Sequence, residues 1–124
     1  MSGSYQSGVC NIGPSEIAQR KKVAMAGFIS AAIFGVLVSL SGSHSPVRFA
    51  IFLPLLIGSI GLIQARKKFC LAFGLLGVYN FGIVGRQERV VDEFARAADR
   101  KVANKIILQS LALAVVLTAA FVAL

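Results

Sequence analysis

Hydrophobic and polar positions follow one another along this chain in long blocks. Three blocks of 19 residues carry almost no charge, at positions 23–41, 47–65 and 106–124. A helix of that length crosses the hydrocarbon core of a bilayer, which is about 30 Å thick. The pattern therefore predicts an all-α integral membrane protein with three transmembrane helices, built as a single membrane domain over residues 1–124.

Turn residues indicate how the first two spans are joined. The short polar stretch 42–46 makes them an antiparallel helical hairpin. Pro14 suits the first position of a helix, since its missing N–H leaves no helical hydrogen bond unmade there. We expect a helix to begin at Pro14 and to continue into the first span. Pro54 predicts a local kink in the second span.

The residues between the second and third spans, 66–105, are expected to form an interfacial segment. Its first part, 69–85, is apolar and aromatic but short for a span, and it contains four glycines before a strongly basic stretch. A fourth span would carry that basic stretch to the opposite side of the membrane. We therefore predict an interfacial or shallow re-entrant segment, with a fourth span as the alternative.

An amphipathic helix is predicted over residues 87–103. Val90, Phe94, Ala98 and Val102 recur every four residues, which is the spacing of one helix face. Such a helix lies on a membrane surface or against a partner. Neither Pro nor Gly interrupts the chain after it, so it can run directly into the third span.

Small residues in the first two spans allow another helix to approach closely. They are Ala24, Gly27, Ala31, Gly35, Gly58 and Gly61. The favoured interpretation is that the first two spans pack against each other within the chain. The alternative is the contact face of a homo-oligomer.

The formal net charge of +8 is explained by topology. Of the 13 Lys and Arg residues, 12 lie before the first span or between the second and third, and only Arg48 lies elsewhere. The positive-inside rule then places the N-terminus and residues 66–105 in the cytoplasm and the C-terminus outside. We expect a multi-pass protein of a bacterial inner membrane. Its partners are membrane lipids, and nucleic acid is not expected.

Residues for catalysis or cofactor binding are scarce. The one histidine, His44, falls in the polar turn, where a solvated side chain is expected, and Arg48 lies at the end of a span. Charges inside the spans, which mark ion and proton paths, are missing. Phosphate-binding, zinc-protease and nucleophile-elbow motifs are missing too. The sequence predicts no catalytic residue, no metal site and no cofactor.

Two cysteines are the exception. Cys10 precedes the first helix and Cys70 follows three basic residues, so both are expected at the same interface. Neighbouring cations favour the reactive thiolate, and thiolates suit soft metals such as Cu(I). The favoured interpretation is two inert, partly buried side chains. The alternatives are sulfur or redox chemistry and, less favoured, metal binding.

Residues 70–77 read Cys-Leu-Ala-Phe-Gly-Leu-Leu-Gly, which resembles the Cys-Pro-Leu-Tyr-x-Leu-Leu-Gly signature of the YgaP-like transmembrane family. These are small bacterial inner-membrane proteins of unknown function. Residues 11–13 (Asn-Ile-Gly), Arg20 and Gly27 resemble that family's opening motif, basic residue and glycine-containing span. The resemblance covers about residues 10–82. Some members are fused to a sulfurtransferase domain, so the resemblance implies sulfur handling.

The chain departs from the family's pattern at two positions. Leu71 replaces the proline of the signature, and Phe81 stands where many members have a second cysteine. We therefore expect a non-catalytic accessory subunit of a larger membrane complex, with respiratory and photosynthetic complexes as candidates. The alternative is a membrane thiol protein that handles sulfur or redox equivalents through Cys10 and Cys70.

Overall fold

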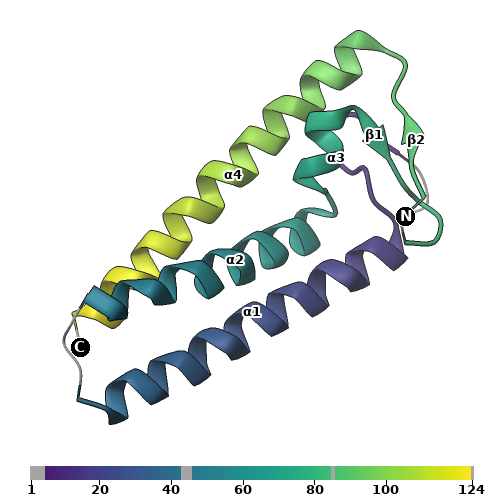
Figure 1. Cartoon of the computed structure of the whole chain (residues 1–124). Helices are drawn as coiled ribbons and strands as arrows, with labels where there is room; N and C mark the ends of the chain where they lie inside the picture. Colours follow the sequence, from purple (N-terminus) through teal and green to yellow (C-terminus); the bar gives the residue numbers. More distant parts are fainter. Residues whose placement is uncertain (1–4, 43–45, 85, 124) are drawn as a thin grey trace.

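Three long helices with a small folded cap at one end make up the molecule (Figure 1). The computed structural model describes residues 5–42, 46–84 and 86–123, so His44 lies outside the described residues. The helices and strands in chain order are α1 (Pro14–Leu40), the 3-10 helix η1 (Pro46–Ile51), α2 (Phe52–Lys67), α3 (Leu71–Leu76), β1 (Val78–Tyr79), β2 (Glu88–Arg89) and α4 (Glu93–Val122).

Three helical stretches are long and apolar enough to cross a membrane: α1, η1 with α2, and α4. This agrees with the predicted number of spans and describes a multi-pass membrane protein. The helix does begin at Pro14, as predicted. Pro54 stands in the first turn of α2, a position that proline tolerates, and the change from 3-10 to α-helix comes two residues earlier.

Helix α2 packs against α1 through glycine. A Cβ atom on Gly27 would lie 2.4 Å from the backbone nitrogen of Gly58, and one on Gly61 would lie 2.7 Å from that of Ala24. No larger residue fits at such a contact without moving the helices apart. The structure thus uses these small residues within the chain. Gly35 differs, because its neighbours are the side chains of Phe121 in α4 and Ile51 in η1.

Helix α4 lies antiparallel to α2 on its other side (Figure 1). A cluster of Ala31, Ile51, Leu55 and Ala114 joins the three helices near one end. Toward the cap, Phe69, Ala103 and Ile106 form a second cluster. Many other large apolar side chains of the helices point outward, as Ile33 and Val116 do at 57% and 63% exposure. This arrangement suits a lipid surrounding.

The segment 69–85 does not form a fourth spanning helix within the described residues. Lys68 adopts a left-handed conformation (φ 55°) and ends α2, and Gly77 (φ 73°) ends the six-residue α3. The chain then forms the two-stranded antiparallel sheet of β1 and β2. This sheet is a small exception to the all-α prediction. We call residues 5–13, 68–84 and 86–102 the cap.

The predicted amphipathic helix begins later than expected, and the face that it buries within the chain is a different one. Helix α4 begins at Glu93 with Asp92 as its N-cap, whose side chain accepts a hydrogen bond from the Phe94 N–H. Val90 therefore precedes the helix, and Phe94 is 85% exposed, while Ala98 and Val102 are half-buried. The buried face lies one residue further along, at Ala95, Asp99 and Ala103. It contains a carboxylate, which a search for apolar spacing passes over.

Candidate functional site

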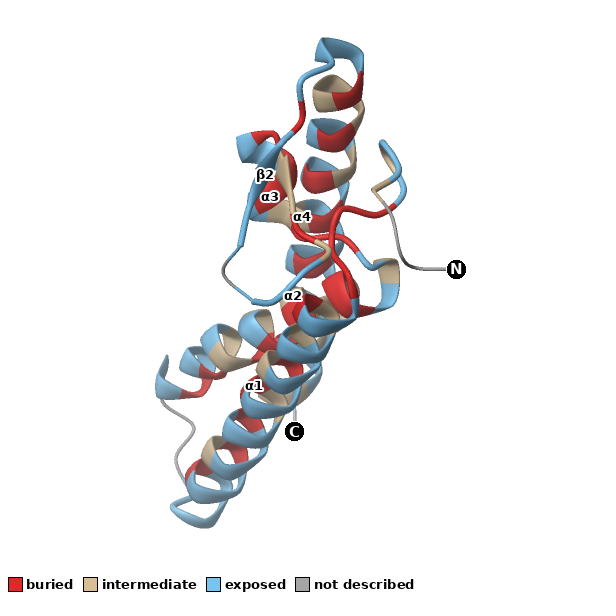
Figure 2. Cartoon of the chain, turned by 90° about the vertical axis from the view of Figure 1, so that its right-hand side faces the viewer, coloured by how far each residue is buried: buried red, intermediate tan, exposed pale blue. Residues whose placement is uncertain are grey.

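The interior of the cap is polar where it meets the beginning of α1. Asn11, Glu16, Asn80 and Asp99 are each at most 3% exposed, and they come from four segments that are far apart in the sequence. Figure 2 shows the buried residues gathered where the loops of the cap meet α4 and the beginning of α1. Burying a polar side chain is unfavourable unless it is hydrogen-bonded. The partners of these side chains therefore decide what the cluster can do.

Asn11 joins the N-terminal segment to the chain after α2. Its Nδ2 donates to the carbonyl oxygen of Cys70 (3.1 Å), and its Oδ1 accepts from the Cys70 N–H (2.7 Å). The Asn11 N–H also donates to the carbonyl oxygen of Lys68. One asparagine thus satisfies both backbone groups of a buried residue 59 positions away, which ties the two segments in a single register.

Asn80 fixes the β1 end of the cap to α1. Its Nδ2 donates to Glu16 Oε2 (2.8 Å) and to the carbonyl oxygen of Ile83 (2.7 Å), while its Oδ1 accepts from the Gly82 N–H. Glu16 in turn forms an ion pair with Arg20, at 3.0 Å. The amide and the carboxylate are thereby paired.

Asp99 fastens the N-terminal segment to α4. Its two oxygens accept hydrogen bonds from the Tyr5 hydroxyl (2.5 Å) and from the Gly8 N–H (2.8 Å). Burial and the hydrogen bond to Asp99 raise the pKa of Tyr5 well above its usual value of about 10. The ring of Tyr5 also stacks on Tyr79, with ring centroids 4.7 Å apart.

Close backbone approaches complete the cap. A Cβ atom on Gly74 would lie 2.7 Å from the ring of Phe69 and 2.9 Å from the carbonyl oxygen of Asp99, so α3 can pack on α4 only with glycine there. At the end of α2, the Gln64 side chain accepts a hydrogen bond from the Leu71 N–H (2.8 Å). The loop between α2 and α3 is therefore held from both sides.

The structure brings the two cysteine-bearing segments together and buries both side chains. Cys70 is 3% exposed, and its Sγ accepts a hydrogen bond from Arg20 Nη2 at 2.9 Å. Cys10 is 8% exposed and lies in a turn closed by backbone hydrogen bonds with Gln6. Neither cysteine forms a disulfide. Contact with reagents in water is restricted for both thiols.

Residues for binding a metal do not converge. Within residues 5–42, 46–84 and 86–123, no three His, Cys, Asp or Glu side chains lie close enough to share an ion. The polar groups of the cap bond mainly to the cap itself and to the ends of α1 and α2. Chemically, the cluster holds four segments in one arrangement.

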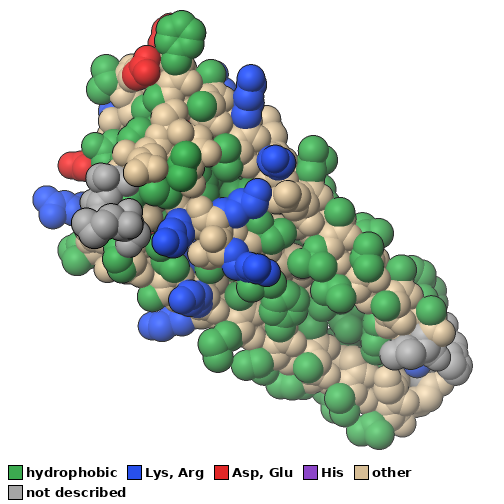
Figure 3. All heavy atoms as spheres, turned by 180° about the vertical axis from the view of Figure 1, so that it is seen from behind, with side chains coloured by type: hydrophobic (Ala, Val, Ile, Leu, Met, Phe, Trp, Pro, Cys, Tyr) green, Lys and Arg blue, Asp and Glu red, His purple; other side chains and the backbone are tan. Residues whose placement is uncertain are grey.

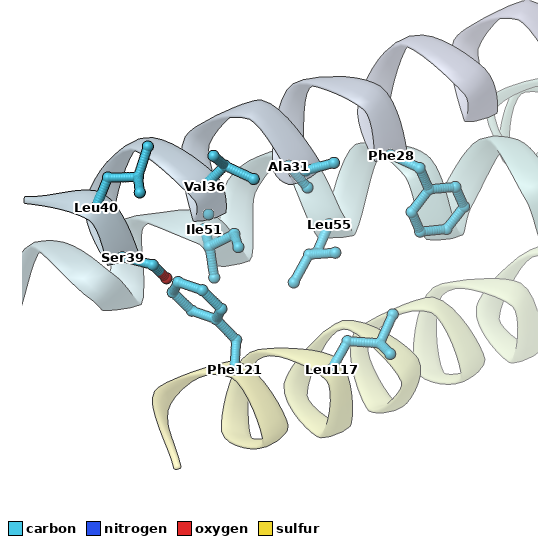
Figure 4. Close-up of a pocket in the computed structure, with 11 residues that line it drawn as sticks. Phe28, Ala31, Val36, Ser39, Leu40, Ile51, Leu55, Leu117 and Phe121 are labelled. Atoms are coloured by element: carbon cyan, nitrogen blue, oxygen red, sulfur yellow. The ribbon is translucent and has the colours of Figure 1, made fainter. Parts of the chain in front are cut away.

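The spanning helices carry a wide apolar groove, of about 570 Å³, between α1, η1 and α4 (Figure 4). Ser39 is the one polar side chain among the residues that line it, and the ring of Phe121 reaches across it toward Ser39 and Ile51. Three hydroxyls buried in the helices, those of Ser59, Ser110 and Thr118, have no hydrogen-bond partner within the described residues. Neither feature provides a polar path across the bundle.

Sequence reasoning singled out Cys10 and Cys70 but gave no site role to the polar residues around them. Asn80 had one visible signal, since it is the single amide inside the apolar stretch 69–84. Asp99 had none, because it stands among other charged residues. Comparison with known proteins adds no assignment: no family model matches the chain, and no curated protein or solved structure is significantly similar to it.

Proposed function

We propose that this protein is a non-catalytic accessory subunit, anchored by three spans, whose cap docks onto a larger partner in a membrane complex. The observation that carries the proposal is a pair of exposed apolar side chains at the tip of the cap. Val91 is 88% exposed and Phe94 is 85% exposed, just before and at the start of α4. Exposed apolar side chains outside lipid suit a contact with another protein.

The distance from the membrane follows from the geometry of α4. Phe94 precedes Lys105 by 11 positions in one continuous helix, which is about 17 Å along its axis. Lys105 is the last cation before the apolar part of α4. Val91 and Phe94 therefore lie well beyond the headgroup layer, so lipid does not cover them. A partner with an apolar surface outside the bilayer would cover them.

In the proposed assembly the cap faces one particular side of the membrane. The proposed membrane is the inner membrane of a bacterium, and the distribution of Lys and Arg supports a cytoplasmic cap with the connection between α1 and η1 outside. The partner is then a protein with a cytoplasmic surface. The hydrogen-bonded interior of the cap supports a structural role, since the buried carboxylates Glu16 and Asp99 already bind other groups of the chain.

Extraction of the full chain in mild detergent tests the proposal. The chain should migrate as part of an assembly much larger than its own 13.1 kDa, and replacing both Val91 and Phe94 by Ser should release it. The Asn104→Ser variant, changed at an exposed position of the same helix, should remain in the assembly. A wild-type monomer would contradict the proposal, as would an assembly that contains only copies of this chain.

The second candidate is a membrane thiol protein that handles sulfur or redox equivalents. One contact favours it: the Arg20 guanidinium donates a hydrogen bond to the sulfur of Cys70, so a cation lies directly beside one of the two thiols. Burial of both cysteines counts against it. Alkylation of the folded protein separates the candidates, because slow labelling of both cysteines and an unaffected Cys70→Ser variant would exclude a thiol function.

A further inference from the structure

A second apolar groove runs along the surface where α1 meets α2, on the half of the bundle nearer the cap. It measures about 470 Å³, and the residues that line it are Lys21, Ala24, Met25, Phe28, Ile29, Leu62 and Ala65. Ala24 and Ala65 are buried, whereas Met25 and Ile29 are 62% and 54% exposed. The groove thus has a floor of small residues and flexible apolar walls that lie open to the membrane.

The end of this groove nearest the cap is basic. Lys21 is the one charged residue that lines it, and Arg66 directly follows Ala65 of the floor. Both side chains are exposed, and neither forms an ion pair with a carboxylate of the described residues. Figure 3 shows Lys and Arg side chains gathered between the apolar body and the end of the molecule where the Asp and Glu side chains lie.

We propose that this groove is a binding site for one anionic phospholipid, with an acyl chain along the groove and the phosphate at Lys21. From Lys21 to Ile29 the groove extends over eight residues of α1, about 12 Å along the axis. A phospholipid carries its negative charge at one end of an apolar chain, which matches a groove that is apolar along its length and cationic at one end. This site is independent of the proposed docking function.

Charge complementarity selects this occupant over a helix of a second copy. Lys22 lies next to Lys21 in α1, and Lys67 and Lys68 lie at the end of α2 at the same level of the bundle. A second copy bound in the groove would bring its own set of these cations beside Lys21. Like charges held together in that way repel. An anionic headgroup instead gains about 1 kcal/mol for each lysine or arginine near it.

Fluorescence quenching by brominated lipid tests the site directly, because the chain contains no Trp. An Ile29→Trp variant places a reporter in the groove, and Ile33→Trp places one on an exposed surface of the same helix outside it. Each is reconstituted in phosphatidylcholine vesicles that contain a minor fraction of brominated lipid, either phosphatidylglycerol or phosphatidylcholine. For each reporter, the quenching efficiency of brominated phosphatidylglycerol is divided by that of brominated phosphatidylcholine. This ratio cancels the effect of how deep the Trp lies in the bilayer.

The ratio should be close to one for Ile33→Trp and about five for Ile29→Trp, because one lysine contact of about 1 kcal/mol corresponds to about a fivefold preference. Adding Lys21→Gln should return the Ile29→Trp ratio to one, and adding Lys22→Gln, which changes the adjacent exposed lysine, should leave it high. Equal ratios for both reporters, or equal loss with Lys21→Gln and Lys22→Gln, would overturn the proposal. If both brominated lipids quench Ile29→Trp less than they quench Ile33→Trp, the proposal is also overturned, because a protein would then occupy the groove.

Discussion

The spanning helices and the cap are held together in opposite ways. Where α1 and α2 touch, the closest contacts are made by Gly and Ala, and many bulky apolar side chains of the two helices face outward. In the cap the buried residues include Asn11, Asn80 and Asp99, which bond to partners far away in the sequence. In lipid, burying apolar surface gives little driving force, so close packing takes its place. Outside lipid, hydrogen bonds specify the arrangement.

The largest effect should come from adding one methyl group between α1 and α2. In Gly27→Ala the new Cβ would lie 2.4 Å from the backbone nitrogen of Gly58, so the helices must separate. We expect a loss of about 3 kcal/mol or more, since overpacking a well-packed contact is unfavourable. Unfolding in mixed micelles, followed by circular dichroism, measures it.

The matched control is Gly82→Ala in the cap, whose Cβ would have its nearest neighbour at 3.6 Å. That variant should unfold almost as the wild type does. If Gly27→Ala and Gly82→Ala unfold alike, close packing does not hold the spanning helices together.

The second effect concerns the cap alone. Asn11→Ala removes both hydrogen bonds to the backbone of Cys70 and leaves its buried N–H and carbonyl without that partner. We expect a local loss of about 2–4 kcal/mol. Hydrogen exchange in nanodiscs should show faster exchange in residues 69–80 and unchanged exchange in the middle of α1 and α2.

Asn104→Ala, at an exposed position of α4, serves as the control and should leave both regions unchanged. Equal acceleration across the cap and the spanning helices in Asn11→Ala would show that the two regions unfold as one. The comparison between them would then lose its basis.

A smaller effect depends on pH. The pKa of Tyr5 is raised in the folded protein, so the protonated hydroxyl is the form that the cap stabilises. Its contribution is complete below the usual tyrosine pKa of about 10 and is lost as the pH rises above that value. Tyr5→Phe should destabilise the cap by about 1 kcal/mol at neutral pH.

The difference between wild type and Tyr5→Phe in hydrogen exchange of residues 5–13 should shrink above pH 10, where the wild type loses this contribution. Tyr79→Phe is a useful companion, since burial also raises the pKa of Tyr79, but its hydroxyl has no hydrogen bond to Asp99. A difference that stays constant with pH would show that Tyr5 acts through its ring alone.

The smallest effect on stability is expected at Phe94. Its side chain is 85% exposed, so Phe94→Ser should change the stability of the isolated protein by less than about 0.5 kcal/mol. Thermal unfolding in detergent measures it. A large loss would mean that the tip of α4 contributes to the fold, and the docking proposal would lose its main support.

Hydropathy and small residues predicted the spanning part well. The number of spans, the start of α1 at Pro14 and close contact at Gly27 and Gly58 all follow from properties of neighbouring residues. These properties can be identified from the residues of one helix at a time. Helices α1 and α4 are longer than their apolar blocks because polar residues extend each of them at the end nearest the cap.

The cap could not be predicted in the same way. Its decisive contacts join Asn11 to Cys70 and Tyr5 to Asp99, which are 59 and 94 positions apart. No local spacing encodes such pairs. In the sequence, Asp99 is indistinguishable from an exposed charge. Segment 69–84 resembles a membrane segment in its apolar composition, but its apolar side chains pack inside a small folded unit.

Accessibility from water tests the division of the molecule most directly. Single cysteines are placed at Phe94 in the cap or at Val115 in α4 of a chain whose Cys10 and Cys70 are replaced by Ser. The purified variants are reconstituted in sealed vesicles of either orientation and treated with a membrane-impermeant maleimide. We predict that Phe94→Cys reacts from one side only, the cytoplasmic side, and that Val115→Cys reacts from neither. Protection of Phe94→Cys from both sides, or reaction of Val115→Cys, would contradict a water-exposed cap on a lipid-embedded bundle.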